Sequence, residues 1–283
     1  MNASRWYCIG LLWLYCAHAM AGARPIERIV SLAPHLTELA FEAGAGPRVV
    51  GTVEYSDEPA PAREIPRIGD AFRIDVERVL ALRPDVILAW STGTPQQTTR
   101  RLRSLGLRVE EFDTQRLADI PAVVRALGRL AGTTQIASAH AARFDREIDA
   151  LRVQYRELAP VRVFLQVNSR PLYTVNGSQL MSELIELCGA RNIFDDLNQL
   201  AAQVSVEAVI ERNPEAIIST DDGDSKSLDT WRKWSHLEAV RTDNLYQLPG
   251  NDLTRATTRL AQGAGMLCRV LDTARVRAAR ARP

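Results

Sequence analysis

One segment of the chain occurs twice, and this repeat limits the possible folds more than any other feature. Residues 74–88 read IDVERVLALRPDVIL, residues 204–218 read VSVEAVIERNPEAII, and the two align without a gap. Each copy has a small polar residue suited to a helix N-cap, an acid in the first turn, and apolar residues at helical spacing. A proline then ends the helix, and the apolar run after it is typical of a buried parallel strand. Two such units about 130 residues apart predict two similar lobes.

The rest of the chain continues this alternation of helices and strands, which predicts the α/β class with parallel sheets. In such sheets ligands lie at the carboxyl ends of the strands. The prolines between residues 59 and 66 exclude regular structure there, and the basic tail after residue 271 is expected to fray. Further strands are predicted at 28–32, 49–50, 108–112, 161–167, 192–194 and 244–248, and a short strand and loop at 68–72. Helices are predicted at 36–43, 96–105, 120–131, 180–187, 228–234 and 255–271, and loops at 168–177, 195–203 and 220–227.

Residues 134–158 predict one long helix. Phe144, Ile148, Leu151, Tyr155 and Leu158 form a single apolar stripe along it. Such a helix is about 37 Å long, enough to join two lobes. The segment contains neither glycine nor proline, so the connection should be rigid and the motion of the lobes small. The predicted organisation is an N-terminal lobe over residues 24–133, a connecting helix over 134–159, and a C-terminal lobe over 160–283.

Residues 1–23 have the features of a secretory signal peptide. Arg5 precedes an apolar run that ends in small residues, and cleavage is expected near residues 19–23. The protein is therefore predicted to be exported. The alternative is an uncleaved membrane anchor, but this run is short for a span and no other apolar run approaches the roughly 18 residues required. Bulky residues before Cys16 argue against a lipid anchor at that cysteine.

Removal of the signal peptide leaves two cysteines, Cys188 and Cys268. In an oxidising compartment such a pair predicts one disulfide, which would close a loop of about 80 residues in the second lobe. The alternative is two free, buried thiols.

The chain lacks the usual signatures of catalysis and of metal binding. The formal net charge of +1 indicates no strong field for nucleic acid or an anionic membrane. The histidines are His18, His35, His140 and His236, far apart in the sequence, and there is no HExxH or CxxC motif. No GxSxG elbow or phosphate-binding loop is present. We therefore expect no enzyme, no catalytic cofactor and no metal site, with an exported enzyme assembled from distant residues as the alternative.

Aromatic residues follow predicted strands in both lobes: Tyr55, Phe72 and Trp90 in the first, and Tyr173 in the second. Rings on loops that face one cleft suit a large flat or apolar ligand, because each ring buries much area at a low entropic cost. The alternative is that these rings cover the edge of the core.

Several motifs of this chain match a known family. They are RIVSLAPHLTELAF, YSDEP, VERVLALRPDVILAW, VFLQV, ELCGARNIF and QVSVEAVIERNPEAII. The chain resembles the periplasmic solute-binding proteins that serve ABC importers for cobalamin, siderophores and haem, and most closely the members that bind cobalamin. The resemblance implies two Rossmann-like α/β lobes with central parallel sheets, one long rigid helix between them, and a ligand cleft between the lobes. It also implies a monomer in which Cys188 and Cys268 are bridged.

The resemblance further implies a corrinoid as the bound ligand, cobalamin in the first place, with a haem or ferric-siderophore binder as the alternative within the family. Where the family pattern has tryptophan, this chain has Ala71 and the pair Ala201–Ala202, and Phe72 offers a replacement for the first. The implied ligand-binding positions are Ala33, His35, Tyr55, Phe72, Trp90, Tyr173, Asn251 and Asp252.

His35 follows a predicted strand and opens a helix beside the expected cleft. One hypothesis is that its imidazole approaches the cobalt of the corrinoid as an axial ligand. The alternative is a histidine that only bonds to the backbone or to water at the helix start.

The acids of the repeat, Glu77 and Glu207, fall on the two docking positions of the family, one in each lobe. The resemblance implies that they face arginines of an inner-membrane ABC permease dimer, which works with its ATPase subunits. A carboxylate near a helix start on each lobe is suited to such bidentate pairing. An acid in a first turn is otherwise commonplace, and helix capping is the alternative for each one alone.

Overall fold

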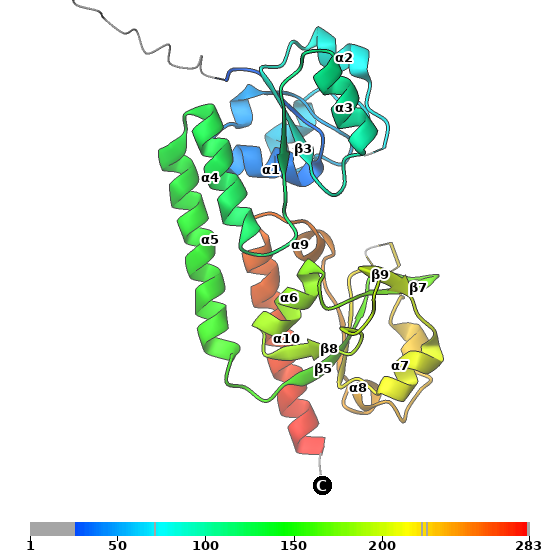
Figure 1. Ribbon diagram of the computed structural model, residues 1–283. Coiled ribbons are helices and arrows are strands. Elements are labelled where there is room, and N and C mark those ends of the chain that lie inside the picture. Colours follow the sequence, from blue (N-terminus) through cyan, green and yellow to red (C-terminus); the bar gives the residue numbers. More distant parts are fainter. Residues whose placement is uncertain (1–25, 71, 222, 225, 282–283) are drawn as a thin grey trace, which may run out of the picture.

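The computed structural model describes residues 26–281, apart from residues 71, 222 and 225. Each half of the chain forms a lobe around a parallel sheet, and a long helix, α5 (Thr134–Tyr155), runs beside both lobes (Figure 1). The predicted α/β class with two lobes and one long connecting helix is confirmed. The predicted signal peptide and Ala71 lie outside the described residues.

The two sheets have the same strand order. The first contains β1 (Ile29–Ser31), β2 (Val49–Gly51), β3 (Val86–Trp90) and β4 (Val109–Phe112) in the order β2-β1-β3-β4. The second contains β5 (Val161–Gln166), β8 (Ala190–Asn192), β10 (Ala216–Ser219) and β11 (Leu245–Gln247) in the order β8-β5-β10-β11. All neighbouring strands in both sheets are parallel. The second lobe therefore repeats the plan of the first, as predicted.

The repeated segment forms a helix followed by a strand in each lobe, α2 (Val76–Ala81) with β3 and α7 (Val206–Arg212) with β10. The side chain of Asp75 accepts a hydrogen bond from the backbone N–H of Arg78 at 3.0 Å, and that of Ser205 accepts one from Ala208 at 3.1 Å. Both residues are thus the N-caps that the sequence predicts.

An acid just before each repeated strand holds the start of its neighbour in the sheet. The Asp85 carboxylate accepts hydrogen bonds from the backbone N–H groups of Glu27 and Arg28, both at 2.8 Å, where the chain enters β1. The Glu215 carboxylate accepts one from Arg162 in β5 at 2.9 Å. The repeat therefore positions the first strand of each lobe as well as its own.

One hydrophobic core runs through both lobes. Strand residues alternate between two faces, and Leu88 of β3 and Leu165 of β5 belong to the same continuous cluster as Phe144 of α5. Helices α1 (Pro34–Glu42), α4 (Asp119–Ala131), α6 (Leu180–Leu187) and α10 (Leu260–Ala281) contribute to this cluster. The opposite faces of the two sheets have separate clusters, which include Ile87 and Ile217 respectively.

Polar contacts also cross between the lobes. The Arg259 guanidinium at the start of α10 pairs with both carboxylate oxygens of Glu38 in α1, at 2.7 and 3.0 Å, and the Glu38 side chain is only 5% exposed. Glu183 of α6 accepts a hydrogen bond from the backbone N–H of Leu117 at 2.9 Å. These bonds add to the shared core in connecting the two lobes.

The structure corrects the prediction in several irregular segments. The proline-rich stretch forms a 3-10 helix at Ala60–Glu64, and among the described residues of 68–72 there is no strand but only an isolated bridge from Gly69 to Ile74. The expected loops at 168–177 and 195–203 contain β6 (Asn168–Ser169), β7 (Leu172–Val175) and β9 (Ala201–Gln203), which make a small antiparallel sheet. Strands this short carry no clear alternation of apolar and polar residues.

The predictions for the C-terminal helices were also inaccurate. Residues 228–234 contain only a 3-10 turn, Asp229–Trp231, and two short helices were not predicted, α8 (Glu238–Arg241) and α9 (Asn251–Thr254). Helix α10 begins at Leu260 and continues to Ala281, so the expected fraying after residue 271 is wrong. Ala274 and Ala278 are buried, and packing of these small residues keeps the end of the helix ordered. The remaining helices, α3 (Gln96–Ser104) and a 3-10 turn at Gly46–Arg48, lie in the first lobe.

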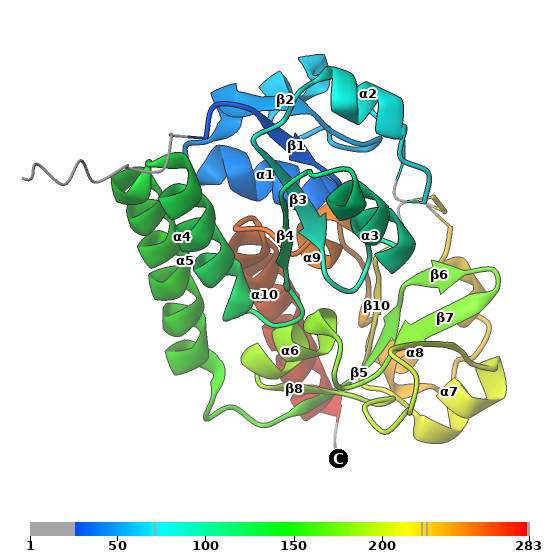
Figure 2. The same ribbon diagram turned by 45° about the horizontal axis from the view of Figure 1, so that its top comes forward.

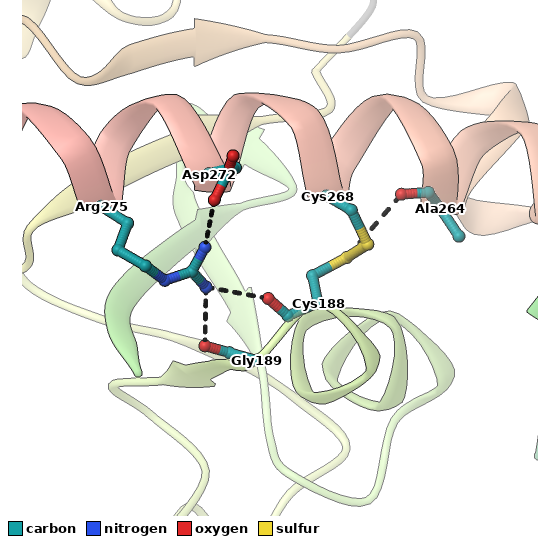
Figure 3. The surroundings of a disulfide bond; sticks show 6 residues. All are labelled: Cys188, Gly189, Ala264, Cys268, Asp272 and Arg275. Atoms are coloured by element: carbon teal, nitrogen blue, oxygen red, sulfur yellow. Dashed lines mark hydrogen bonds and ion pairs between the residues drawn. A yellow bond between two sulfur atoms is a disulfide. The ribbon is translucent and has the colours of Figure 1, made fainter. Parts of the chain in front are cut away.

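Cys188 and Cys268 form a disulfide, which confirms the predicted pairing. The bond joins the end of α6 to the middle of α10 (Figure 3). Beside it, the Arg275 guanidinium donates to the backbone carbonyl oxygens of Cys188 and Gly189, both at 3.1 Å, and pairs with Asp272 at 2.9 Å (Figure 3). The end of α6 is therefore held to α10 both covalently and by hydrogen bonds.

The double variant Cys188→Ala/Cys268→Ala tests the contribution of this bond. The disulfide closes a loop across 80 positions of sequence, so its loss should lower the free energy of unfolding by about 4 kcal/mol in the chain-entropy account. Urea unfolding of the oxidised protein and of the variant measures the difference. Wild-type protein unfolded in the presence of a reductant should match the variant. An unchanged urea midpoint in the variant would contradict this account.

Candidate ligand cleft

A cavity of about 510 Å³ lies between the two lobes. Its wall on the first lobe is formed by the start of α1, the end of β3 and the loops after β3 and β4, with Pro34, His35, Trp90, Thr92, Thr114 and Gln115. The aliphatic part of the opposite wall contains Val175, Leu180, Leu200, Ala201 and Ala256, and its polar part contains Ser178, Gln179, Thr254 and Arg255. The cavity thus lies at the carboxyl ends of the strands of the first lobe, as the sequence predicts.

Trp90 provides the largest ring of the cavity wall. It is the last residue of β3, its side chain is partly exposed, and its backbone N–H donates to the Thr94 hydroxyl at 3.0 Å. The loop turns closely beneath the indole, because a Cβ atom on Gly93 would lie 1.8 Å from the ring atom Cε3. Glycine at this position therefore allows the ring to rest against the loop.

His35 lies beside Trp90 and is largely buried. Its ring meets the indole edge to face, with centroids 5.0 Å apart and an interplanar angle of 82°. Its Nε2 is 3.3 Å from the Thr114 hydroxyl oxygen. Burial, together with the positive charge of Arg255, lowers the pKa of His35 to about 4. The imidazole is therefore neutral at neutral pH.

Arg255 reaches the cavity from the second lobe and crosses to the first. Its Nη1 pairs with the Asp57 carboxylate at 2.7 Å, and the arginine side chain is 16% exposed. Partial burial acts to raise the pKa of Asp57, but the hydrogen bond and charge of Arg255 outweigh it and leave that pKa below its usual value. The cleft thus contains a cation whose charge is already compensated by one carboxylate.

The structure places two of the predicted ligand-binding residues, His35 and Trp90, in the cavity wall. Ala33 is buried directly before α1. Tyr55 and Phe72 lie outside the wall of the cavity and are strongly exposed, at 77% and 83%.

In the second lobe the predicted residues lie close to the cavity but not in its wall. Tyr173 is part of β7 and is partly buried. Asn251 is exposed at the start of α9, and Asp252 pairs with Arg259 at 3.0 Å. The end of the same helix and the residue after it, Thr254 and Arg255, face the cavity instead. Helix α9 lies between the two lobes in both views of the ribbon (Figure 1, Figure 2).

The sequence did not single out most of the polar residues of the wall. Thr114 and Gln115 follow β4, so their position after a strand was an available signal. Ser178 and Gln179 precede α6 and had no comparable signal, because only the packing of the two lobes brings them to the cavity.

Within the described part of the chain, no three His, Cys, Asp or Glu side chains gather closely enough to hold a metal ion. None of the helices described is long and apolar enough to cross a membrane.

The fold and the cleft agree with the comparison to known proteins. Residues 29–251 match the sequence model of a family described as periplasmic binding protein. The chain belongs to this family. One similar member is a Vitamin B12-binding protein of Vibrio cholerae serotype O1, which is 35% identical over 251 residues, 88% of this chain and 91% of that protein.

Two solved structures extend the comparison. The crystal structure of the periplasmic vitamin B12 binding protein BtuF of Vibrio cholerae has a TM-score of 0.82 at 34% identity, over 88% of this chain and 98% of that chain. The periplasmic heme binding protein HutB of Vibrio cholerae has a TM-score of 0.75 at 21% identity, over 86% of this chain and 98% of that chain. The second similarity concerns the fold alone.

The variant Gly93→Ala tests whether the position of the Trp90 ring depends on this glycine. The new methyl group cannot share the space of the indole, so the ring should leave its position and become more accessible to acrylamide quenching. Trp90→Phe identifies the contribution of Trp90 to the fluorescence. Gly265→Ala in α10 is the matched control, because its Cβ meets only an arginine side chain at 3.5 Å and quenching should not change. Identical quenching in Gly93→Ala and the wild type would show that Trp90 does not depend on this glycine.

Proposed function

We propose that this periplasmic binding protein captures a corrinoid, cobalamin in the first place, and delivers it chemically unchanged to an ABC permease. The composition of the cavity wall carries this proposal. A corrinoid is a large ring system with neutral amide groups around its edge. The first wall offers it an indole and an imidazole, the second offers aliphatic side chains, and Gln115, Ser178 and Gln179 offer hydrogen bonds suited to amides.

The chemistry of the wall favours a corrinoid over the other ligands known in this family. A ferric siderophore with several anionic groups requires several arginines, but Arg255 is the one arginine among the described wall residues and it is paired with Asp57. A haem with axial ligands on both faces requires a tyrosine or histidine from each lobe. Among the described residues of the wall, the second lobe supplies neither.

The similar proteins support the same choice. Both the Vibrio cholerae protein at 35% identity and the solved structure at 34% identity are named for vitamin B12, whereas the haem-binding structure shares only 21% identity. A corrinoid is also large for the cavity, so part of it would lie beyond the wall. The exposed side chains of Tyr55 and Phe72, which lie outside the wall, would then cover that part.

The proposal includes export and a division of the chain. Residues 1–23 would act as the export signal, residues 24–133 and 160–283 would form the lobes of the mature monomer, and residues 134–159 would connect them. No catalytic step is part of the proposal, and the corrinoid is cargo.

Glu77 and Glu207 are the proposed docking points for the permease. Both are exposed in the first turn of α2 and α7, and neither forms an ion pair with another described residue. The two helices lie at the outer ends of the lobes, on the side away from α5 (Figure 1, Figure 2). Two separated carboxylates are therefore free to meet one arginine on each of two permease subunits.

Calorimetry on the mature protein tests the choice of ligand. We expect sub-micromolar binding of cyanocobalamin and no comparable binding of haem or a ferric siderophore. Trp90→Ala removes the main ring of the wall and should weaken cyanocobalamin binding by about 1–3 kcal/mol. Binding of haem with the higher affinity would contradict the proposal.

Charge reversal tests the docking role. The variant Glu77→Arg/Glu207→Arg should bind cyanocobalamin like the wild type, because both side chains lie outside the cleft, but should not support its uptake. Uptake is measured in vesicles that contain the permease and its ATPase subunits. The control Glu157→Arg/Glu186→Arg makes the same change of charge at exposed acids off the docking helices and should transport normally. Normal uptake by the docking variant would exclude this role for the two glutamates.

A further inference from the structure

His35 is the one histidine in the cavity wall among the described residues. The other described histidines are engaged elsewhere. His140 in α5 contacts the Glu42 carboxylate at 2.6 Å, and His236 packs against the ring of Trp234. A metal-containing ligand in the cleft would therefore meet a single imidazole, and it would meet it on the wall of the first lobe.

The imidazole is held in place before any ligand arrives. Pro34, directly before His35, is the first residue of α1, and the backbone of Ala33 before it is extended. The start of the helix therefore fixes the backbone at His35. Trp90 supports the ring from one side, and Thr114 meets its Nε2. A ring that is already ordered loses little conformational entropy on binding, which is the usual condition for a metal ligand in a built site.

The state of the ring also suits coordination. A metal takes the unshared electron pair of a neutral imidazole, and the burial of the His35 ring favours this neutral form. When the Thr114 hydroxyl accepts the Nε2–H, the unshared pair is on Nδ1. Thr114 would then act as the outer partner that fixes the tautomer and orientation of a ligating histidine.

We infer that His35 coordinates the metal of the bound corrinoid from the wall of the first lobe. This inference rests on the proposed function. It adds that the cleft prefers a corrinoid with water in the upper axial position to one with cyanide there. In a corrinoid with water in the upper axial position, the bond from cobalt to water breaks, the bond from cobalt to the imidazole nitrogen forms, and water leaves. The oxidation state of cobalt does not change. Cyanide is a much stronger ligand, so cyanocobalamin would bind without this exchange.

The visible spectrum of the bound corrinoid tests the inference. Excess protein should shift the absorption bands of aquocobalamin, because an imidazole nitrogen replaces water, and should leave those of cyanocobalamin in place. His35→Ala should abolish the shift and lower the affinity for aquocobalamin at least about tenfold. His140→Ala should keep both, since that residue lies outside the cleft.

The outcomes separate this inference from the proposed function. Calorimetric binding of aquocobalamin by the wild type with unchanged bands would overturn the role of His35 and leave corrinoid binding intact. Failure of both corrinoids to bind would overturn the two together. The wild-type spectrum decides the question even if His35→Ala does not fold, and His35→Gln gives a second variant with a polar side chain of similar size.

Discussion

The continuous hydrophobic core between the lobes is the interaction on which the rest of the structure depends. One face of each sheet faces this core, α5 runs along it beside both lobes, and α10 packs against it in the second lobe. The separate clusters on the outer faces stabilise each lobe but do not join them. Because a packed core deforms only at a high cost, we expect the two walls of the cleft to keep a defined separation without ligand.

Two ion pairs also join the lobes, and one of them lies next to the ligand cavity. The pairs Arg259–Glu38 and Arg255–Asp57 both join the second lobe to the first, and the second pair borders the cavity. Burial is the main reason that His35 is neutral, and the charge of Arg255, which also helps to tie the lobes together, adds to this effect. Removing Arg259 would leave the buried Glu38 carboxylate without this partner, so that pair contributes to the stability of the contact between the lobes.

The sequence predicted the parts of the molecule that depend on local patterns. Asp75 and Ser205 are N-caps as expected, the repeat forms a helix and a strand in each lobe, and Cys188 is bonded to Cys268. The cavity wall was harder to predict from the sequence, because most of it comes from loops that meet only after the lobes have packed. Trp90 ends a strand and His35 lies in the first turn of the helix that follows one, and both were found, whereas Ser178 and Arg255 depend on the relative position of the lobes.

The distance between the lobes, measured with and without cyanocobalamin, tests the central claim most directly. Spin labels on cysteines at Arg101 of α3 and Glu211 of α7, both exposed, do not compete with the native cysteines because those are bonded to each other. The account predicts one narrow distance distribution that stays within about 2 Å when the protein is saturated with corrinoid. A broad distribution without ligand, or a shift of several ångströms on saturation, would contradict a cleft preformed by a shared core.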